Sequence, residues 1–417
     1  MLKIIAQWPT QCFHEWIPAD VNVGYFVADR IRKHTPDQFE NIRSDLDELL
    51  LEYDFLIFCT NEIPKLPDIF RIHDIMNDYD KRSQIIFSYS SSTTEALEFY
   101  EEYCSRLGWE PVKLFFFNHC QLLEQPHSIV WNPDLILLDH YDRSKVFNCL
   151  NYGFRHHRSE IVADIFLNNL DDLGYVTYGD LNLSNLDFSE INLEERVVNF
   201  YNENRSMFPL TIDNPHDFGD RCDWSPLIID AVNDSFLSVC VEVFYHEYQC
   251  IDNDTIMEKF DTDYDVMGIS AEDLNNVYPH LKKDITMLNR YGYLPNTKLI
   301  SEKSYRSFIT GTIGIYLNSS HTVDILRNNY DVFDDIVDHS YDNYEDNNKR
   351  YDLFMTELKR LCGIKMDTWR KIYRDTLDRR RANFDVRIQT LKARRANKLK
   401  NVDFAQDPND LVKLLQK

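Results

Sequence analysis

The sequence predicts an α/β fold with two Rossmann-like domains followed by a helical C-terminal extension. A chain of 417 residues is too long for one ordinary hydrophobic core, so two domains are expected. Short apolar runs alternate with amphipathic stretches along most of the chain, as they do where helices cover a parallel sheet. From Asn347 onward the pattern is helical, without any strand-like run.

The first domain is predicted over residues 1–144. Its apolar runs are short and nearly continuous, which is typical of strands buried on both faces of a parallel sheet. These runs span residues 2–8, 54–60, 83–90, 112–118 and 135–139. Between them, residues 91–108 are predicted to form a helix that Ser92 or Thr93 can cap and Gly108 can end.

The second domain is predicted over residues 145–350 and the extension over 351–417. The second domain repeats the strand and helix order, because strand-like runs and amphipathic stretches again alternate. Its predicted strands are 145–151, 235–245 and 312–317, and its clearest helices are 158–174, which a glycine would end, and 319–329. Residues 252–298 are irregular and acidic. In the extension, which is expected to pack back on the body, residues 367–400 form either one long basic helix or two.

The net charge of −24 is unevenly distributed. Residues 351–417 hold 17 Lys and Arg against 9 Asp and Glu, so residues 1–350 carry a net charge of −32. An acidic body disfavours nucleic acid as a bulk ligand, although the basic extension could contact phosphate locally. The chain has no apolar run long enough for a membrane span, and its first residues do not read as a signal peptide. With nine cysteines scattered singly, mostly buried reduced thiols and a cytoplasmic protein are expected.

Adjacent opposite charges lie where one predicted strand gives way to a helix, in the stretch KLISEKSYRSF (298–308). Ligands of open α/β sheets bind beyond the carboxyl ends of the strands, and a helix N-terminus there attracts phosphate. Lys303 could neutralise a phosphate, and Glu302 could accept hydrogen bonds from sugar hydroxyls. A nucleotide sugar presents both groups. The alternative is a solvated first turn without any ligand.

Three motifs of this chain resemble those of a family of glycosyltransferases of tailed bacteriophages and giant viruses, and they occur in the family's order along the chain. The donor domain of that family is distantly similar to that of α1,3-fucosyltransferases. The first motif is the triplet Ser301, Glu302 and Lys303, followed by a strand, a small-residue loop and a helix, and closed by DHSYD (338–342). The second is CLNYGFRHHRSEIVADIFLNNLDDLGYVTYGDL (149–181), with an Arg-x-x-Arg cluster, and the third is an acidic strand end at Glu242. The loop 318–322 lacks the family's usual Gly and Pro.

The resemblance implies a GT-B-like fold, in which the two Rossmann-like domains face a cleft and the second binds a nucleotide sugar. It implies sugar transfer to an acceptor hydroxyl, with the sugar nucleotide as co-substrate and no other cofactor. By the resemblance, the donor-binding residues are Arg155, Arg158, Glu242, Ser301, Glu302 and Lys303. Arginine forks suit diphosphate oxygens, and Arg158 is the favoured one of the pair. If the protein is viral, the host cytoplasm is its expected location.

No metal site is predicted. His156 and His157 have no further Cys or His nearby in the sequence to complete a zinc set, and the acidic triplet at Asp261 and Asp263 is common in so acidic a chain. Transfer is therefore expected to be metal-independent.

The catalytic base and the acceptor stay open. A base is expected at a strand end of the first domain. His14 and Glu15 are the preferred candidates, and Glu62 and His119 are the others. The acceptor could be a hydroxymethylated base in phage DNA, which Arg394, Arg395 and Lys398 would help to hold, or a glycan or small molecule. The alternative function is that of a binding module without catalytic activity. For the extension, the simpler interpretation is a basic helix that only neutralises the acidic body.

Overall fold

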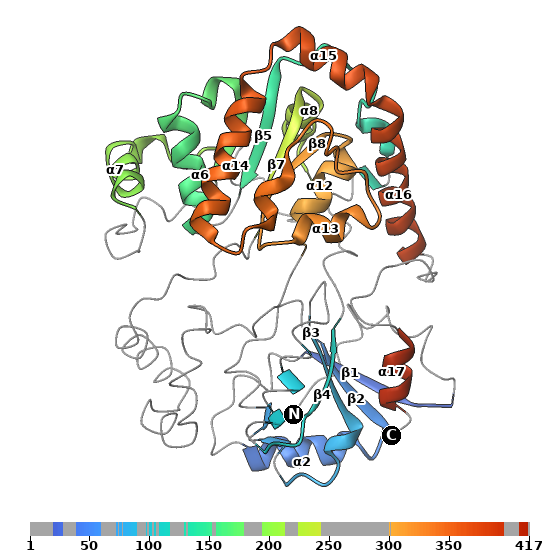
Figure 1. Ribbon diagram of the computed structural model, residues 1–417. Helices are drawn as coiled ribbons and strands as arrows, with labels where there is room; N and C mark the ends of the chain where they lie inside the picture. Colours follow the sequence, from blue (N-terminus) through green and yellow to red (C-terminus); the bar gives the residue numbers. More distant parts are fainter. Residues whose placement is uncertain are drawn as a thin grey trace. The chain divides into compact units, whose positions relative to one another are not determined.

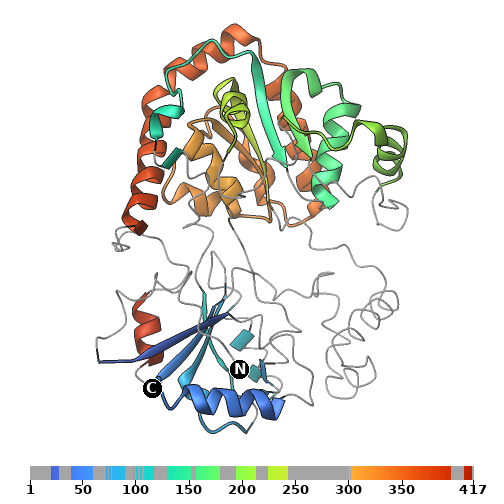
Figure 2. The same ribbon diagram turned by 180° about the vertical axis from the view of Figure 1, so that it is seen from behind.

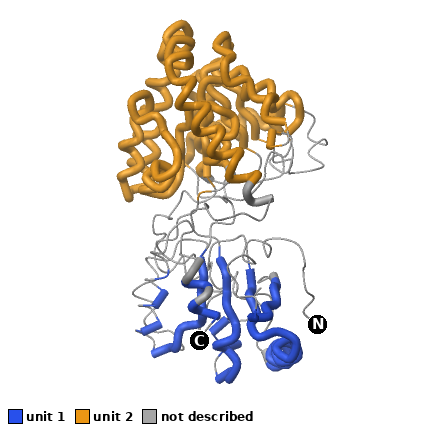
Figure 3. The backbone as a smooth tube through the Cα atoms, turned by 90° about the vertical axis from the view of Figure 1, so that its right-hand side faces the viewer, with its two compact units in different colours: residues 1–120, 246–299, 394–417 blue, residues 121–245, 300–393 orange. Residues whose placement is uncertain are grey.

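Figure 1 and Figure 2 show the computed structural model of the chain from two opposite sides. The described residues are 20–27, 39–59, 72–73, 75–76, 78–89, 97, 100–101, 104–105, 108–116, 129–130, 132–151, 156–178, 194–212, 224–242, 300, 302–395 and 408–415. The chain divides into two compact units, which comprise residues 1–120, 246–299 and 394–417, and residues 121–245 and 300–393 (Figure 3). The predicted domain limits at 144 and 350 do not coincide with this division.

Unit 1 contains a parallel sheet of four strands in the order β1-β2-β3-β4. Its strands are β1 (Val23–Val27), β2 (Phe55–Cys59), β3 (Ile85–Tyr89) and β4 (Lys113–Phe116), with α2 (Phe39–Leu49) between the first two and the short turn η3 (Arg82–Gln84) before the third. The middle strands are buried along nearly their whole length, since Leu56, Phe58 and Phe87 are fully enclosed. The predictions for 54–60, 83–90 and 112–118 are confirmed. β1 was not predicted, and the predicted strand 2–8 lies outside the described residues.

The prediction of a strand at 135–139 is wrong. Pro133 opens a 3-10 turn, η5 (Pro133–Leu135), and the chain then bends. Side chains satisfy the backbone of this apolar segment in place of a neighbouring strand. Asn233 accepts from the Leu137 N–H at 2.9 Å and donates to the Leu135 carbonyl at 2.8 Å. Ile136 is buried whereas Leu137 is 45% exposed, so this apolar run does not lie within a buried sheet.

Unit 2 contains a second parallel sheet of four strands, in the order β6-β5-β7-β8. The strands are β5 (Lys145–Asn151), β6 (Gly174–Tyr178), β7 (Ser235–Val241) and β8 (Ile313–Leu317). The first strand in the sequence therefore lies between the second and the third. The strand order reverses between β5 and β7, which is the topological switch point of a doubly wound sheet. Both sheets are parallel, so the predicted α/β class with parallel sheets is confirmed.

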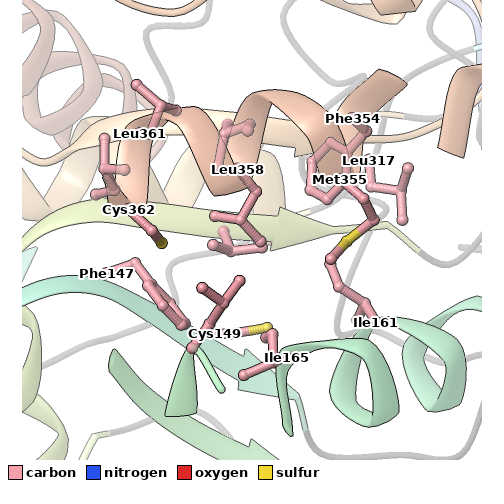
Figure 4. Close-up of a cluster of buried hydrophobic side chains, with 14 of the residues drawn as sticks. Phe147, Cys149, Ile161, Ile165, Leu317, Phe354, Met355, Leu358, Leu361 and Cys362 are labelled. Atoms are coloured by element: carbon pink, nitrogen blue, oxygen red, sulfur yellow. The ribbon is translucent and has the colours of Figure 1, made fainter. Parts of the chain in front are cut away.

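Helices cover both faces of the unit 2 sheet, as the alternation along β8 shows. Ile313, Ile315 and Leu317 join the large core that packs against α6 (His156–Leu167), α7 (Glu195–Glu203), α14 (Asn347–Cys362) and α15 (Met366–Asp375). Tyr316 points the other way, into a cluster with α12 (Glu302–Thr310) and α13 (Thr322–Arg327). Figure 4 shows the large core where α14 crosses the sheet. Because successive residues of a strand face opposite sides, one strand serves both layers.

One helix of unit 2 differs from the prediction at its end, and the structure decides between the two alternatives for the basic stretch. α6 ends at Leu167 and not at Gly174, because Asn169 takes a left-handed conformation (φ 56°) and the short turn η6 (Asp171–Leu173) follows. Gly174 instead begins β6. The basic stretch 367–400 contains α15 and α16 (Leu377–Arg395), which are separated at Thr376, so the two-helix alternative is correct for the described part.

The C-terminal helices are divided between the units. α14 and α15, together with α16 as far as Ala393, belong to unit 2. α17 (Pro408–Leu415) belongs to unit 1, where Leu411 and Leu415 are buried and Lys113 on β4 donates to the Leu414 carbonyl at 2.6 Å. Among the described C-terminal helices, α17 is the one that belongs to the unit of the N-terminal sheet.

Two buried arginines join α15 and α16 to the amino end of the unit 2 sheet. Arg143 and Arg380 lie 4.2 and 3.3 Å from the ring centroid of Tyr373. Arg380 donates to the carbonyls of Leu138 and Gly311, at 2.9 and 3.1 Å. Arg143 likewise donates to backbone carbonyls, including that of Val232 at 2.8 Å. Burial lowers the pKa of both guanidinium groups, and the carbonyl oxygens together with the π-face of the ring compensate for lost hydration.

Gly311 is expected to be sensitive to substitution. Its φ is +59°, and a Cβ there would lie 2.0 Å from Leu138 Cδ2. Gly311→Ala should therefore lower the free energy of unfolding by at least about 1 kcal/mol, from the left-handed backbone alone. The matched control in the same unit is Gly363→Ala. Gly363 has φ −77° and a Cβ there would make ordinary contacts, so this variant should be neutral or slightly stabilising. Equal thermal midpoints for the two variants would contradict this account.

A buried histidine makes unit 1 sensitive to acid. His73 shares a hydrogen bond of 2.7 Å with the hydroxyl of Tyr100, and Trp109 packs over its ring at 4.6 Å. Burial lowers the pKa of His73 to about 4, from its ordinary value of 6.5. The folded unit thus favours the neutral ring. Stability from this group is complete above pH 6.5 and is lost as the pH falls toward 4, because the unfolded chain then binds the proton more readily.

We expect this loss to reach about 3 kcal/mol at pH 4, given 1.4 kcal/mol for each unit of pKa shift. His73→Gln removes the titrating ring, so its thermal midpoint should fall less steeply between pH 6.5 and 4.5 than that of the parent protein. His140→Gln, at a partly exposed histidine in unit 2, is the control and should keep the parent slope. Parallel slopes for the parent and His73→Gln would show that the buried ring does not titrate in this range.

Candidate functional site

The carboxyl edge of the unit 2 sheet, at the switch point, is the candidate site. β5 ends at Asn151 and β7 at Val241, and the helices α6 and α12 begin at this edge. Open α/β sheets bind ligands at such an edge because the connections on its two sides diverge there. In unit 1, by contrast, the described strands follow one another in chain order and contain no such reversal.

Glu242 connects the elements of this edge. Its backbone N–H donates to the Leu317 carbonyl at 3.0 Å, which extends the pairing of β7 with β8. Its backbone carbonyl accepts a hydrogen bond from His157 Nε2 in the first turn of α6. Its side-chain Oε1 accepts from the N–H and the Oγ of Ser304, at 3.1 and 2.5 Å. The carboxylate is fully buried and lies at the N-terminus of α12, where the helix dipole favours a negative charge.

Cationic side chains come to this edge from both helices. Arg158 is buried in the first turn of α6, and Lys303 is half-buried in the first turn of α12. Arg306 follows one turn later, donates to the Leu150 carbonyl at 2.8 Å and lies over the ring of Trp224 at 5.6 Å. An otherwise acidic chain therefore places three cations at this edge of the sheet, and Arg306 lies close to the end of β5.

Both arginines, Arg158 and Arg306, affect the pKa of the buried Cys149 thiol on β5. Burial raises its pKa to about 12, and Asn151, Arg306 and Arg158 each oppose that rise. Both guanidinium groups are thus within electrostatic range of one buried atom on the central strand. The arrangement can attract an anion, and the N-terminal N–H groups of α12 add to the attraction.

The structure locates some of the predicted donor-site residues. Arg158 and Glu242 lie at one edge with Lys303, on three different elements. Glu302 begins α12, although its side chain is outside the described part. Ser301 and Arg155 are outside the described residues, as are the base candidates His14, Glu15, Glu62 and His119 and the acidic pair Asp261 and Asp263. Arg306 was not predicted, although its position one helical turn after Lys303 was the available signal.

The DHSYD motif forms a 3-10 turn, η11 (His339–Asn343), beside β8. The Tyr341 hydroxyl accepts from the Tyr316 N–H at 3.1 Å, and Asp342 Oδ2 accepts from the Val323 N–H at 2.8 Å. Burial raises the pKa of Asp342 to about 6, against the opposing effect of that bond and of Arg350. The described contacts of the motif hold α13 against the sheet.

Arg379, Arg380 and Arg381 at the start of α16 all make contacts within unit 2. Arg379 forms paired hydrogen bonds with Asp331 and Asp335, and Arg380 is fully buried. Arg381 is exposed and lies 4.0 Å from Asp378. These contacts favour the neutralising account for this part of the helix. Arg394 and Arg395 end α16 with undescribed side chains, and Lys398 lies outside the described residues.

The comparisons with known proteins find no match among family models, curated proteins or solved structures. Within the part of the chain that the structure describes, no group of His, Cys, Asp and Glu side chains is arranged to hold a metal ion. No helix among the described residues is both long and apolar enough to cross a membrane.

We expect the three cations to contribute to anion binding. Lys303→Ala and Arg306→Ala should each weaken binding of a nucleoside diphosphate by about 1.5–3 kcal/mol, the size of a charge-assisted hydrogen bond. Lys371→Ala is the matched control, because it removes an exposed cation on α15 that pairs with Asp375. Calorimetry on the four proteins measures the effect. Affinities that fall equally in all three variants would indicate a general charge effect and no site.

Proposed function

We propose that the protein is a glycosyltransferase that takes a sugar from a nucleotide-sugar donor bound at the carboxyl edge of the unit 2 sheet. The observation that carries the proposal is the gathering of Arg158, Lys303 and Arg306 at the switch point between β5 and β7. Such a set of cations suits a diphosphate, and it is supplied by two helices of a chain whose net charge is −24. The resemblance of residues 145–350 to a glycosyltransferase family supports the choice of a sugar nucleotide as ligand.

The chemistry follows from the leaving group. Transfer breaks the bond between the sugar C1 and the phosphate oxygen, and the electron pair leaves with the diphosphate. Cations and helix N–H groups stabilise the charge that develops there. The acceptor oxygen forms the new bond to C1, and a base takes the proton of the hydroxyl. Because side chains supply the positive charge, we propose that the chemical step needs no divalent ion.

The acceptor is proposed as a hydroxyl on a hydroxymethylated base in DNA, with a glycan or a small molecule as the alternative. Arg394 and Arg395 are the last residues of α16, and Lys398 follows in the sequence; these three side chains would contact the DNA backbone. The second candidate function is a binding module that retains the nucleotide site without catalysis. The serine-rich loop 318–322, which departs from the family pattern, favours this candidate.

The experiment offers the purified protein a panel of UDP-, GDP-, ADP- and dTDP-sugars and follows release of the nucleoside diphosphate. Each sugar nucleotide is tested alone, with unmodified DNA and with DNA that contains hydroxymethylcytosine. We expect one donor to be consumed, and consumption to survive a chelator of divalent ions. Lys303→Ala should lower the rate and Lys371→Ala should not.

The outcomes separate the candidates. Donor binding without any consumption identifies a binding module. Consumption that modified DNA does not stimulate removes DNA as the acceptor, and a rate that chelator abolishes and manganese restores shows that a metal takes part. If the protein binds no member of the panel, the proposed function is wrong.

A further inference from the structure

We infer that Glu242 sets the charge of the proposed site and favours release of the nucleoside diphosphate product over release of the sugar-nucleotide donor. The inference rests on the proposed function and concerns the same site. It assigns Glu242 a role in discriminating between two anions, which differs from a direct contact with a sugar hydroxyl.

The geometry separates Glu242 from a direct ligand contact. The side chain has no exposed surface, and its Oε1 is held by the N–H and Oγ of Ser304. The two donors of Ser304 and the N-terminus of α12 favour a negative charge on this carboxyl group, and Ser304 is next in the chain to Lys303. This negative charge therefore offsets part of the positive potential that Lys303, Arg306 and Arg158 create at this edge.

A second feature of the same edge indicates that it is built for a polar ligand. Asn318 directly follows β8, whose last carbonyl bonds to Glu242, and its side chain is only 1% exposed. The Oδ1 of Asn318 accepts from the Ser319 N–H at 2.7 Å, while its Nδ2 has no hydrogen-bond partner among the described residues. A buried amide donor without an acceptor is costly unless a ligand or water supplies one.

Sugar transfer changes the charge of the bound nucleotide. In the donor, each phosphate carries one negative charge. In the product, the terminal phosphate has lost its sugar ester and takes a second charge above a pH of about 6. The product is thus attracted more strongly than the donor by any net positive site, and a fixed negative charge reduces that difference. Glu242 would in this way limit inhibition by the product.

Two variants test the role of the charge apart from the role of the geometry. Glu242→Gln removes the charge and keeps an oxygen that can accept from Ser304. Ser304→Ala removes the hydroxyl donor and keeps the charge. Dissociation constants are measured for UDP and UDP-glucose, and for GDP and GDP-mannose, with thermal unfolding as a check that each variant is folded.

In Glu242→Gln, we expect the dissociation constant of the donor, divided by that of the product, to rise by about three- to ten-fold. This is the effect of one protein charge acting on one additional ligand charge. The increase should shrink in high salt. Ser304→Ala should weaken both ligands alike and leave the ratio unchanged.

A ratio that stays at the parent value in Glu242→Gln overturns the inference, even if the parent protein transfers sugar. A shifted ratio in a protein that consumes no donor supports the role of Glu242 in discrimination and removes only the proposed catalysis. If the parent protein and Glu242→Gln both bind none of the four nucleotides, the inference and the proposed function are both wrong.

Discussion

The hydrogen bonds of Glu242 hold the carboxyl edge of the unit 2 sheet in one arrangement. Its backbone continues the pairing of β7 with β8 and receives His157 from α6, and its side chain holds the first turn of α12. The elements that carry Arg158, Lys303 and Arg306 are therefore positioned relative to one residue. A site built from several cations needs hydrogen bonds of this kind, because like charges on separate helices repel one another.

Much of the fold follows from patterns that the sequence displays directly. The buried strands β2 and β8 are continuous apolar runs, and β3 is interrupted only by Ser88. Such runs are typical of strands that helices cover on both faces of a parallel sheet. The prediction of a strand at 135–139 failed because the side chains of Asn233 and Arg380, from distant positions in the sequence, and of the nearby Arg143 bond to its backbone. The local sequence pattern does not indicate which remote side chain will donate a hydrogen bond to a backbone carbonyl.

The same distinction applies to the candidate site. Arg158, Glu242 and Lys303 could be singled out because strand ends and helix starts are visible in the sequence, and because they lie in the motifs on which the expected resemblance rests. The partner of Glu242 could not, since Ser304 is an ordinary helix residue until the fold places its N–H opposite a carboxylate. The basic composition of the extension also suggested a positively charged surface, but some of its arginines are buried. Arg380 and Arg387 are among its buried side chains, so their charge serves packing.

The location of α17 has a consequence for the order in which the protein folds. Lys113 on β4 contacts Leu414 across 301 positions of the chain, and Leu411 and Leu415 are buried in the unit that holds the N-terminal sheet. During synthesis, domains usually complete in order from the N-terminus. Here the N-terminal sheet waits for residues 408–415, whereas the described core of unit 2 is available once residue 393 has been made. The second unit can therefore mature first, and a ribosome that stalls after α16 would leave the first sheet without its last helix.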